Sequence, residues 1–250
     1  AAVVVKHNNP CGAAEDKDLA KAYFYAWKCD QLSAFGGIVA LNRKVDVKAA
    51  KIIAKSGFLE CIIAPAFDQE ALVLFQDKKN LRLLEAPDLE AIDEPDLKRV
   101  SGGLLLQGKD LETMDINNLK VVTKKKPTKK ELESLIFGWK VAKHVRSNAI
   151  VFSSAERTLG IGAGQPSRVG SVKLAMMKFN EPRTPNLEPR TIVCASDAFF
   201  PFADNIEELA KAGATAVIQP GGSIKDAEVI AAADKHNLAM VFTGVRHFRH

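Results

Sequence analysis

The sequence of 250 residues is short of several features, and each shortage excludes a class of protein. No apolar run approaches the roughly 20 residues that a membrane-spanning helix needs. The first residues, "AAVVVKH", are too few for a secretory leader and lack its basic lead-in. The net charge of +5 is mild, so it suits small anionic substrates and is weak evidence for nucleic acid. We therefore expect a cytoplasmic protein without a membrane partner, and a chain that begins inside a strand of something longer.

Metal-binding patterns are missing as well. The four cysteines stand without the spacing of a zinc site or of a disulfide framework: Cys11, Cys29, Cys61 and Cys194. Zinc-dependent nucleobase deaminases need His-x-Glu and Pro-Cys-x-x-Cys, because an imidazole and two thiolates complete the metal shell. Here no second thiolate follows Pro10-Cys11 at that spacing, and His-x-Glu does not occur. The sequence therefore predicts reduced thiols and no zinc.

Apolar runs and amphipathic stretches alternate along the chain, without a repeat of fixed period. The apolar runs predict strands over 3–6, 36–42, 61–64, 148–154, 191–196, 215–219 and 238–243. The amphipathic stretches predict helices over roughly 16–29, 46–56, 68–77, 128–145, 166–178, 204–212 and 224–236. Thr128 and Glu131 have the spacing of a capping box, and Asp46 and Asp204 are expected N-caps. This alternation is typical of an α/β fold with largely buried strands.

A polar, proline-containing stretch divides the chain. It includes "EAPDLEAIDEPDL", then "SGGLLLQGKD", then a lysine cluster. We expect an N-terminal α/β lobe over 1–95, a connecting hairpin or linker over 96–130, and a C-terminal α/β lobe over 131–250. A second loose segment, 178–190, has three prolines and no periodicity, which predicts a surface loop.

Lys6 and His7 stand side by side where an expected strand ends. Neighbours in a regular strand point to opposite faces. Asn8-Asn9 and Pro10 end the strand, however, and we expect Pro10-Cys11-Gly12 to form the turn, so both side chains can enter one pocket. The pair is then a candidate acid/base pair. The alternative is a surface lysine beside a histidine at the rim of the fold.

Two further motifs suit an anionic, planar ligand. Gly160, Gly162 and Gly164 precede an expected helix and Arg168, an arrangement that lets backbone N–H groups approach an anion. The alternative is a hairpin glycine cluster with a surface arginine. The aromatic run 199–202 follows an expected buried strand, where open α/β sheets place planar ligands. Its alternative is a local apolar cluster.

Taken in order, the motifs resemble a known family. They are "KHNNPCGAA", "SAFGGIVALNR", "SNAIVF", "LGIGAGQPSRV", "SDAFFPFADN", "IQPGGS" and the terminal "RHFRH". Together they resemble the transformylase part of the bifunctional AICAR transformylase/IMP cyclohydrolase enzymes of purine biosynthesis, in their bacterial form. The resemblance implies a cytidine-deaminase-like α/β fold of two related lobes, with mixed sheets flanked by helices. It also implies that this chain is the C-terminal part and lacks the IMP cyclohydrolase domain of a bifunctional parent.

That family transfers a formyl group from 10-formyltetrahydrofolate to the 5-amino group of AICAR, giving FAICAR. The resemblance implies that His7 is the general base, with Lys6 and Asn148 stabilising the transition state. It places the AICAR-binding positions on His7, Gly36, Glu60, Asn148, Arg168, Phe199 and Arg246, and the folate-binding positions on Val169, Asp204, Ser223 and Ile224. Glu60 stands where the family usually has an aspartate, and Ala203 replaces the arginine of the family's "FFPFRD".

The resemblance also implies no covalently bound cofactor and no metal, with 10-formyltetrahydrofolate as co-substrate. It implies a homodimer whose active site is shared between subunits. The competing hypothesis is a non-catalytic nucleotide- or nucleic-acid-binding α/β domain, which would use the lysines of 120–130 and the basic tail 243–250. Because no aromatic residues are interleaved with those lysines, a solvated face is the simpler interpretation.

Overall fold

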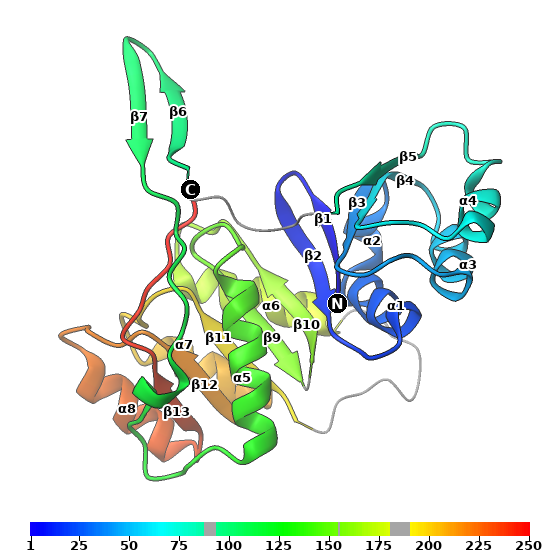
Figure 1. Cartoon of the computed structure of the whole chain (residues 1–250). Helices are drawn as coiled ribbons and strands as arrows, with labels where there is room; N and C mark the ends of the chain where they lie inside the picture. Colours follow the sequence, from blue (N-terminus) through cyan, green and yellow to red (C-terminus); the bar gives the residue numbers. More distant parts are fainter. Residues whose placement is uncertain (88–93, 155, 181–190) are drawn as a thin grey trace.

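The computed structural model describes residues 1–87, 94–154, 156–180 and 191–250 (Figure 1). Within these residues the chain forms an eleven-stranded mixed sheet flanked by helices, and a separate two-stranded hairpin. The strand order of the large sheet is β5-β4-β3-β1-β2-β10-β9-β11-β12-β13-β8. The predicted α/β class is confirmed. No helix in the described part of the chain is both long and apolar enough to cross a membrane.

Lobe 1 is the half of the sheet from β5 to β2. Its elements are β1 (Ala2–Lys6), β2 (Asn9–Ala14), α1 (Leu19–Cys29), α2 (Gln31–Ala34), β3 (Gly37–Leu41), α3 (Val47–Lys55), β4 (Leu59–Ala64), α4 (Gln69–Phe75) and β5 (Arg82–Glu85). An antiparallel hairpin, β1–β2, is followed by three strands that are parallel to one another, β3, β4 and β5. Helices α1, α3 and α4 bury their alanine, leucine and isoleucine faces in one core with these strands.

Lobe 2 repeats this plan. Its elements are β8 (Lys120–Val121), α5 (Lys129–Ala142), β9 (Ile150–Ser154), β10 (Arg157–Gly162), α6 (Arg168–Asn180), β11 (Val193–Ser196), α7 (Asp204–Lys211), β12 (Ala216–Gln219), α8 (Asp226–Lys235) and β13 (Ala239–Phe242). Again an antiparallel hairpin, β9–β10, precedes three mutually parallel strands. Two apolar cores lie on the two faces of its sheet. The two related α/β lobes expected from the resemblance are therefore present.

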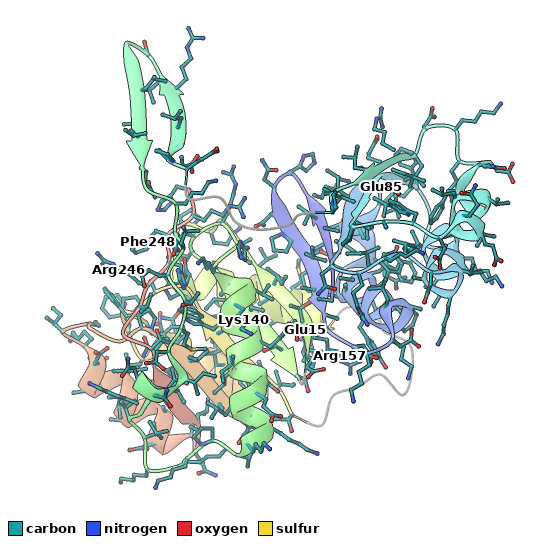
Figure 2. The ribbon with its side chains drawn as sticks, viewed as in Figure 1. Glu15, Glu85, Lys140, Arg157, Arg246 and Phe248 are labelled. Carbon is teal, nitrogen blue, oxygen red and sulfur yellow. The ribbon has the colours of Figure 1, made fainter. Side chains whose placement is uncertain are left out.

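The lobes join through their hairpins. Arg157 of β10 pairs with Ala14 of β2 in antiparallel register, and the Ala13 N–H donates to Thr158 Oγ1 at 3.0 Å. Glu15 and Arg157 lie close together at this junction in Figure 2. Because the sheet continues through the junction, each lobe supplies half of one continuous surface.

The connecting region contains the expected hairpin, built from β6 (Asp96–Val100) and β7 (Gly103–Gln107). It stands away from the body of the molecule (Figure 1). A segment from 108 to 119, with one 3₁₀ turn at Ile116–Asn118, then runs back along lobe 2. We call this segment the strap. Residues 88–93 of the expected linker lie outside the described residues.

Several helix boundaries match their sequence signals. Thr128 and Glu131 form the predicted capping box, and the Asp46 side chain accepts from the Ala49 N–H at 2.7 Å. Asp204 was a wrong prediction, because it is the first residue of α7 and Ala203 holds the N-cap position. The expected loop over 178–190 is also wrong at its start, since α6 continues to Asn180; the remainder, 181–190, lies outside the described residues.

Four described strands outside the β6–β7 hairpin were not expected, namely β2, β5, β8 and β10, and two of them, β2 and β10, contain glycines that a helix packs against. Pro10-Cys11-Gly12 lies inside β2 and is not the turn. Gly160 and Gly162 lie inside β10, and not in a loop ahead of a helix. A Cβ on Gly162 would meet the Ser171 carbonyl oxygen at 1.9 Å, so the glycines let α6 lie directly on the strand. The anion-cradle interpretation of these two glycines is therefore wrong.

Candidate functional site

The strand directions bring the predicted site residues to one edge of the sheet. Strand β1 ends at Lys6, and β3, which is antiparallel to it, begins at Gly37. Strand β10 runs in the same direction as β1, because both are antiparallel to β2. Strand β11 also runs in this direction, because β10 and β11 are both antiparallel to β9. The carboxyl ends of β11, β12 and β13 therefore lie at the same edge as the end of β1. We call this the site edge.

The Lys6–His7 pair lies in a tight turn at the site edge. Lys6 pairs with Asn9, so His7 and Asn8 are the two central residues of a hairpin. Both have positive φ, 52° and 59°, as in the type I′ turns that fit two-residue hairpins. The turn aims both Lys6 and His7 at one cavity of about 680 Å³ between the lobes. The expected meeting of the two side chains is thus achieved by a different turn from the one predicted.

The Lys6 side chain is held by a backbone carbonyl group of the loop that precedes β3. Its Nζ donates to the Phe35 carbonyl oxygen at 2.5 Å. Gly36 has φ +69°, and a Cβ built on it would lie 3.8 Å from Lys6 Nζ. The predicted substrate position Gly36 therefore adjoins the ammonium group, and the positive φ there favours glycine.

The charged side chains around the pair's cavity are mainly cationic. Besides Lys6 and His7 the cavity is lined by Asn9, Pro10, Cys11, Asp30, Ser33, Arg146, Ile161, Ala163, Leu174 and Lys178. Lys178 and Asp30 form an ion pair at 3.1 Å, and the Arg146 N–H donates to Asn9 Oδ1 at 3.0 Å. Burial, together with the nearby Asp30 carboxylate, raises the pKa of the Cys11 thiol to about 12. Cys11 therefore lines the cavity as a neutral thiol at pH 7 and does not act as a nucleophile.

Six of the predicted positions line a second cavity, of about 500 Å³, in lobe 2. They are Asn148, Arg168, Val169, Phe199, Asp204 and Arg246. Phe202 and Phe248 complete its aromatic lining, and Arg246 and Phe248 reach it from the C-terminal tail (Figure 2). Phe200, by contrast, is buried in the core of lobe 2, so the aromatic run is divided between the cavity and the core.

Arg168 is the buried centre of this second cavity. Its guanidinium bonds the Asp197 carboxylate, donates to Ser196 Oγ at 2.8 Å and donates to Asn148 Oδ1 at 2.8 Å. Asn148 is fixed further by donating from Nδ2 to the Gln165 carbonyl oxygen at 2.8 Å. The arginine therefore orients Asn148, and its charge is largely balanced by Asp197.

The family comparison agrees with the motifs. A sequence model described as "AICARFT/IMPCHase bienzyme" matches residues 1–178. The chain belongs to the AICARFT/IMPCHase bienzyme family. It is 56% identical over 258 aligned residues to "Bifunctional purine biosynthesis protein PurH" of Magnetococcus marinus, and 52% identical over 259 to the protein of that name from Anaeromyxobacter sp. strain K. All of this chain is covered in both alignments, but only 48% of each relative, so the chain spans about half the length of these curated relatives.

Four predicted family positions line neither cavity: Gly36, which adjoins Lys6, and Glu60, Ser223 and Ile224. Glu60 is near the start of β4 and forms an ion pair with Arg82 at 2.7 Å. Ser223 and Ile224 follow β12 at the site edge, and the Ile224 side chain is fully exposed. No described residue lines both cavities, so the predicted positions fall into two groups: Lys6 and His7 of lobe 1 at the cavity between the lobes, and six positions of lobe 2 at the second cavity.

Sequence reasoning missed the residues that hold the C-terminal tail. The His247 side chain points away from Arg246 and Phe248, is 1% exposed, and packs on Trp139 with ring centroids 4.3 Å apart. Its Nδ1 shares a hydrogen bond of 2.5 Å with Asp110 of the strap. Within "RHFRH", Arg246 and Phe248 line the cavity and His247 between them is buried, whereas Arg249 and His250 are exposed, so the sequence pattern gives no sign of the role of His247.

Asp197 was also missed, although it stands in the quoted motif "SDAFF". Its side chain is 1% exposed and accepts from the Ala149 N–H at 3.1 Å, from the Ser147 hydroxyl and from Arg168. Its own backbone carbonyl accepts from the His247 N–H at 2.9 Å. A single buried aspartate thus connects β9, α6 and the tail, and the sequence carries no local sign of these contacts.

Proposed function

We propose that this chain carries the formyltransferase activity of its family. The reaction transfers the formyl group of 10-formyltetrahydrofolate to the 5-amino group of AICAR and gives FAICAR and tetrahydrofolate, a step of purine biosynthesis. The observation that carries the proposal is the Lys6–His7 turn, which presents an imidazole and an ammonium group to one cavity. The IMP cyclohydrolase activity would then belong to a part of a longer protein that this chain does not include.

The proposed chemistry assigns a task to each group. The AICAR amine is a poor nucleophile, because its lone pair is drawn into the imidazole ring and the carboxamide. His7 takes a proton from the amine as nitrogen attacks the formyl carbon. Lys6 and Asn148 stabilise the oxyanion that forms on the formyl oxygen. When the bond from carbon to folate N10 breaks, N10 receives a proton and tetrahydrofolate leaves.

The lobe 2 cavity suits the substrate side of the proposal. Arg246 is exposed at its rim and supplies a cationic fork for a phosphate or carboxamide group. Phe199 and Phe248 offer apolar faces to a planar ring. Val169 and Asp204 extend the same lining toward the proposed folate side, with Ser223 and Ile224 beyond it at the site edge. Arg168 then acts chiefly by orienting Asn148, since Asp197 already balances its charge.

The base and the substrate cavity belong to different lobes. Because no described residue lines both cavities, we propose that a second copy of the chain completes each site, with lobe 1 of one subunit facing lobe 2 of the other. The active unit is then a homodimer with shared sites.

The proposed chemistry needs no metal ion and no covalently bound cofactor. Among the residues that the structure describes, no group of three or more histidine, cysteine or acidic side chains is placed to hold a metal. All four cysteines are buried, and Cys11 has no second thiolate beside it at the spacing of a zinc site. The proposed co-substrate is 10-formyltetrahydrofolate, bound and released in each turnover.

A nucleic-acid-binding role has less support. Lys125 donates to the Thr215 carbonyl oxygen at 2.9 Å and lies 3.7 Å from Glu131, while Lys129 pairs with Glu133. These lysines therefore serve lobe 2 itself in part, and we expect no salt-sensitive binding of DNA or RNA by the chain.

The test is formyl transfer by the purified 250-residue chain, followed as tetrahydrofolate release with AICAR and 10-formyltetrahydrofolate. His7→Asn removes the base but keeps a residue type that tolerates positive φ. We expect it to lower kcat by about 10²- to 10⁴-fold. The matched control is Asn8→Gly, which preserves the same turn and leaves His7 in place, and it should keep most of the activity.

Two outcomes would overturn the proposal. One is a wild-type chain that transfers no formyl group at subunit concentrations where it dimerises. The other is a His7→Asn variant with unchanged kcat. Lys6→Ala extends the test to the oxyanion, with an expected loss in kcat larger than the change in KM for AICAR.

A further inference from the structure

We propose that Asp110 of the strap and His247 of the C-terminal tail are positioning residues, which together hold Arg246 and Phe248 in place in the lobe 2 cavity. We call the pair Asp110–His247 the clasp. The inference deepens the proposed function and rests on it, because the ligand that the clasp serves is AICAR bound in that cavity. Its evidence is the way in which the tail, residues 243–250, is attached to lobe 2.

The tail has little structure of its own with which to place its side chains. It follows β13 without forming a helix or a strand, and within 246–250 only His247 is buried. Two backbone hydrogen bonds tie this part of the tail: the His247 N–H donates to the Asp197 carbonyl oxygen at 2.9 Å, and the Ser147 N–H donates to the Arg249 carbonyl oxygen at 2.9 Å. His247 is therefore the buried side chain that anchors the segment.

The His247 ring is held on two sides. It packs on Trp139 of α5 with ring centroids 4.3 Å apart. Its Nδ1 shares a hydrogen bond of 2.5 Å with Asp110 Oδ2. Its Nε2 is buried, and within the described part of the chain it has no hydrogen-bond partner. The bond to Asp110 is therefore the polar contact that sets the orientation of the ring.

Asp110 is itself held from α5. Its Oδ1 lies 3.5 Å from Lys143 Nζ, and the same ammonium group donates to the Glu112 carbonyl oxygen at 2.8 Å. The strap therefore presents the carboxylate at a fixed place. The Asp110 side chain is nevertheless 34% exposed, so it can be replaced without opening the core.

The two neighbours of His247 are the part of the tail that lines the cavity. Arg246 and Phe248 lie close together on the tail in Figure 2, and the Arg246 Cζ lies 5.3 Å from the centroid of the Phe248 ring. Among the described residues, no carboxylate forms an ion pair with Arg246, whereas Asp197 pairs with Arg168 of the same cavity. Arg246 is therefore the guanidinium of this cavity that can receive an anion, and the residue next to it in the chain is the clasped histidine.

Holding the tail matters for binding more than for the chemical step. A guanidinium binds a phosphate best when two of its N–H groups meet two oxygens, which requires a defined position. A loose tail would have to be ordered each time the ligand binds, and that ordering weakens affinity. The proposed base, His7, belongs to lobe 1 and does not touch the tail. Loss of the clasp should therefore raise KM for AICAR and leave kcat nearly unchanged.

The experiment compares the variant Asp110→Ala with the wild-type 250-residue chain, by calorimetric titration with AICAR and by the formyl-transfer assay. We expect Kd and KM for AICAR to rise about 10-fold while kcat changes less than about 2-fold. Simple charge attraction predicts the opposite sign, because removal of a carboxylate makes the cavity more positive for an anionic ligand. Asp110→Asn keeps an oxygen that can accept from His247 Nδ1, and it should recover most of the affinity.

The matched control is Glu112→Ala, which removes an exposed carboxylate from the same strap and should bind AICAR like the wild type. A double-variant cycle then tests whether the clasp acts through its neighbour. In an Arg246→Ala background, Asp110→Ala should weaken AICAR binding by less than about 3-fold, because the group that the clasp positions is gone. A full 10-fold further loss would show that Asp110 acts in another way, and the proposal would be wrong.

Hydrogen exchange of the tail is a readout that needs no ligand. We expect the amides of 243–250 to exchange about 10-fold faster in Asp110→Ala than in the wild type, as measured by mass spectrometry, and Asp110→Asn to restore the slower exchange. Circular dichroism checks that each variant is folded. Unchanged exchange of the tail in Asp110→Ala, or AICAR affinity equal to that of the wild type, would refute the clasp.

The two readouts separate this proposal from the proposed function. If Asp110→Ala weakens AICAR binding and loosens the tail while the wild type transfers no formyl group, the clasp is confirmed and the proposed reaction is wrong. If the wild type binds no AICAR, the proposed substrate is wrong, and the exchange of the tail alone decides whether the clasp holds Arg246 and Phe248.

Discussion

Replacing Asp197 tests how the lobe 2 site is held together. The Asp197 carboxylate accepts from the Ala149 N–H, from the Ser147 hydroxyl and from the Arg168 guanidinium, and its side chain is 1% exposed. Asp197→Ala leaves these donors without their acceptor in a site that water barely reaches. One of them is a guanidinium that is itself only 6% exposed.

The expected loss in the free energy of unfolding is large. Removing one partner of a buried ion pair typically costs about 3–5 kcal/mol, because the remaining charge stays buried without compensation. For a chain of this size, each kcal/mol lowers Tm by about 2–4 °C. We therefore expect Tm to fall by about 6–20 °C. Asp197→Asn should lose less, because its amide oxygen still accepts from the Ala149 N–H.

The assay is urea unfolding at pH 7, followed by circular dichroism, for Asp197→Ala, Arg168→Ala and the double variant. We expect the double variant to lose less free energy of unfolding than the two single variants lose together. The reason is that Arg168→Ala removes the guanidinium that Asp197→Ala leaves buried without its partner. Glu208→Ala, which breaks the surface pair with Lys211, is the control and should leave the free energy of unfolding unchanged within error. An Asp197→Ala chain within about 1 kcal/mol of the wild type, or strictly additive losses, would refute the reasoning.

Three further predictions follow from single features of the structure. Gly162→Ala should lower Tm by several degrees, because the added Cβ would meet the Ser171 carbonyl oxygen at 1.9 Å. If Gly162 instead formed part of an anion-binding loop, the substitution would weaken phosphate binding and leave Tm unchanged. Burial of Asp110 raises its pKa, but the His247 hydrogen bond and nearby positive charge outweigh this effect and hold the pKa below its ordinary value. The stability that Asp110 contributes should therefore be full above about pH 4 and be lost as pH falls further. The free energies of unfolding of Asp110→Asn and of the wild type, measured in urea, should then converge at low pH. Burial raises the pKa of Cys11 to about 12, so iodoacetamide at pH 8 should label it at least about 100-fold more slowly in the folded chain than in guanidinium, as measured by mass spectrometry.

Elements with a strong local signal could be predicted from the sequence. The helix over 128–145 was found because Thr128 and Glu131 cap it and apolar residues follow at helical spacing; the structure has α5 at Lys129–Ala142. The strand over 215–219 was found because a β-branched apolar run lies between turn residues; the structure has β12 at Ala216–Gln219. In both cases the intrinsic preference of the residues for helix or strand agrees with the position of the element in the buried core.

The strands β2 and β10 could not be found in this way. Their sequences, "NPCGAA" and "RTLGIG", contain proline or glycine, which are poor strand formers. They are strands because helices pack against their glycines: a Cβ on Gly12 would lie 2.1 Å from the Ala26 carbonyl oxygen of α1, much as Gly162 lies under α6. Contacts between residues far apart in the sequence decided their structure, and a local pattern does not contain them.

The same limit applied to the site. The Lys6–His7 pair could be named as a candidate because its members are adjacent in the sequence, although the turn was placed at the wrong residues. The contact of His247 with Asp110 joins residues 137 positions apart, and Asp197 reaches Ser147 across 50 positions. Such buried pairs depend on how the tail and strap are laid over lobe 2, and no spacing in the sequence encodes that.

The directions of the strands explain why two separate half-sites lie at one edge. The parallel strands of lobe 1 run opposite to those of lobe 2, because the order from β3 through β1, β2, β10 and β9 to β11 is antiparallel at every step. The carboxyl ends of β11, β12 and β13, where α/β sheets bind ligands, therefore share an edge with the end of β1. Had the lobes been joined by one strand fewer, Lys6–His7 and Arg246 would lie at opposite ends of the sheet. The proposed two-fold partner approaching that edge could then not complete both sites at once, so the antiparallel junction between β2 and β10 is the feature of the fold on which the proposed shared site depends.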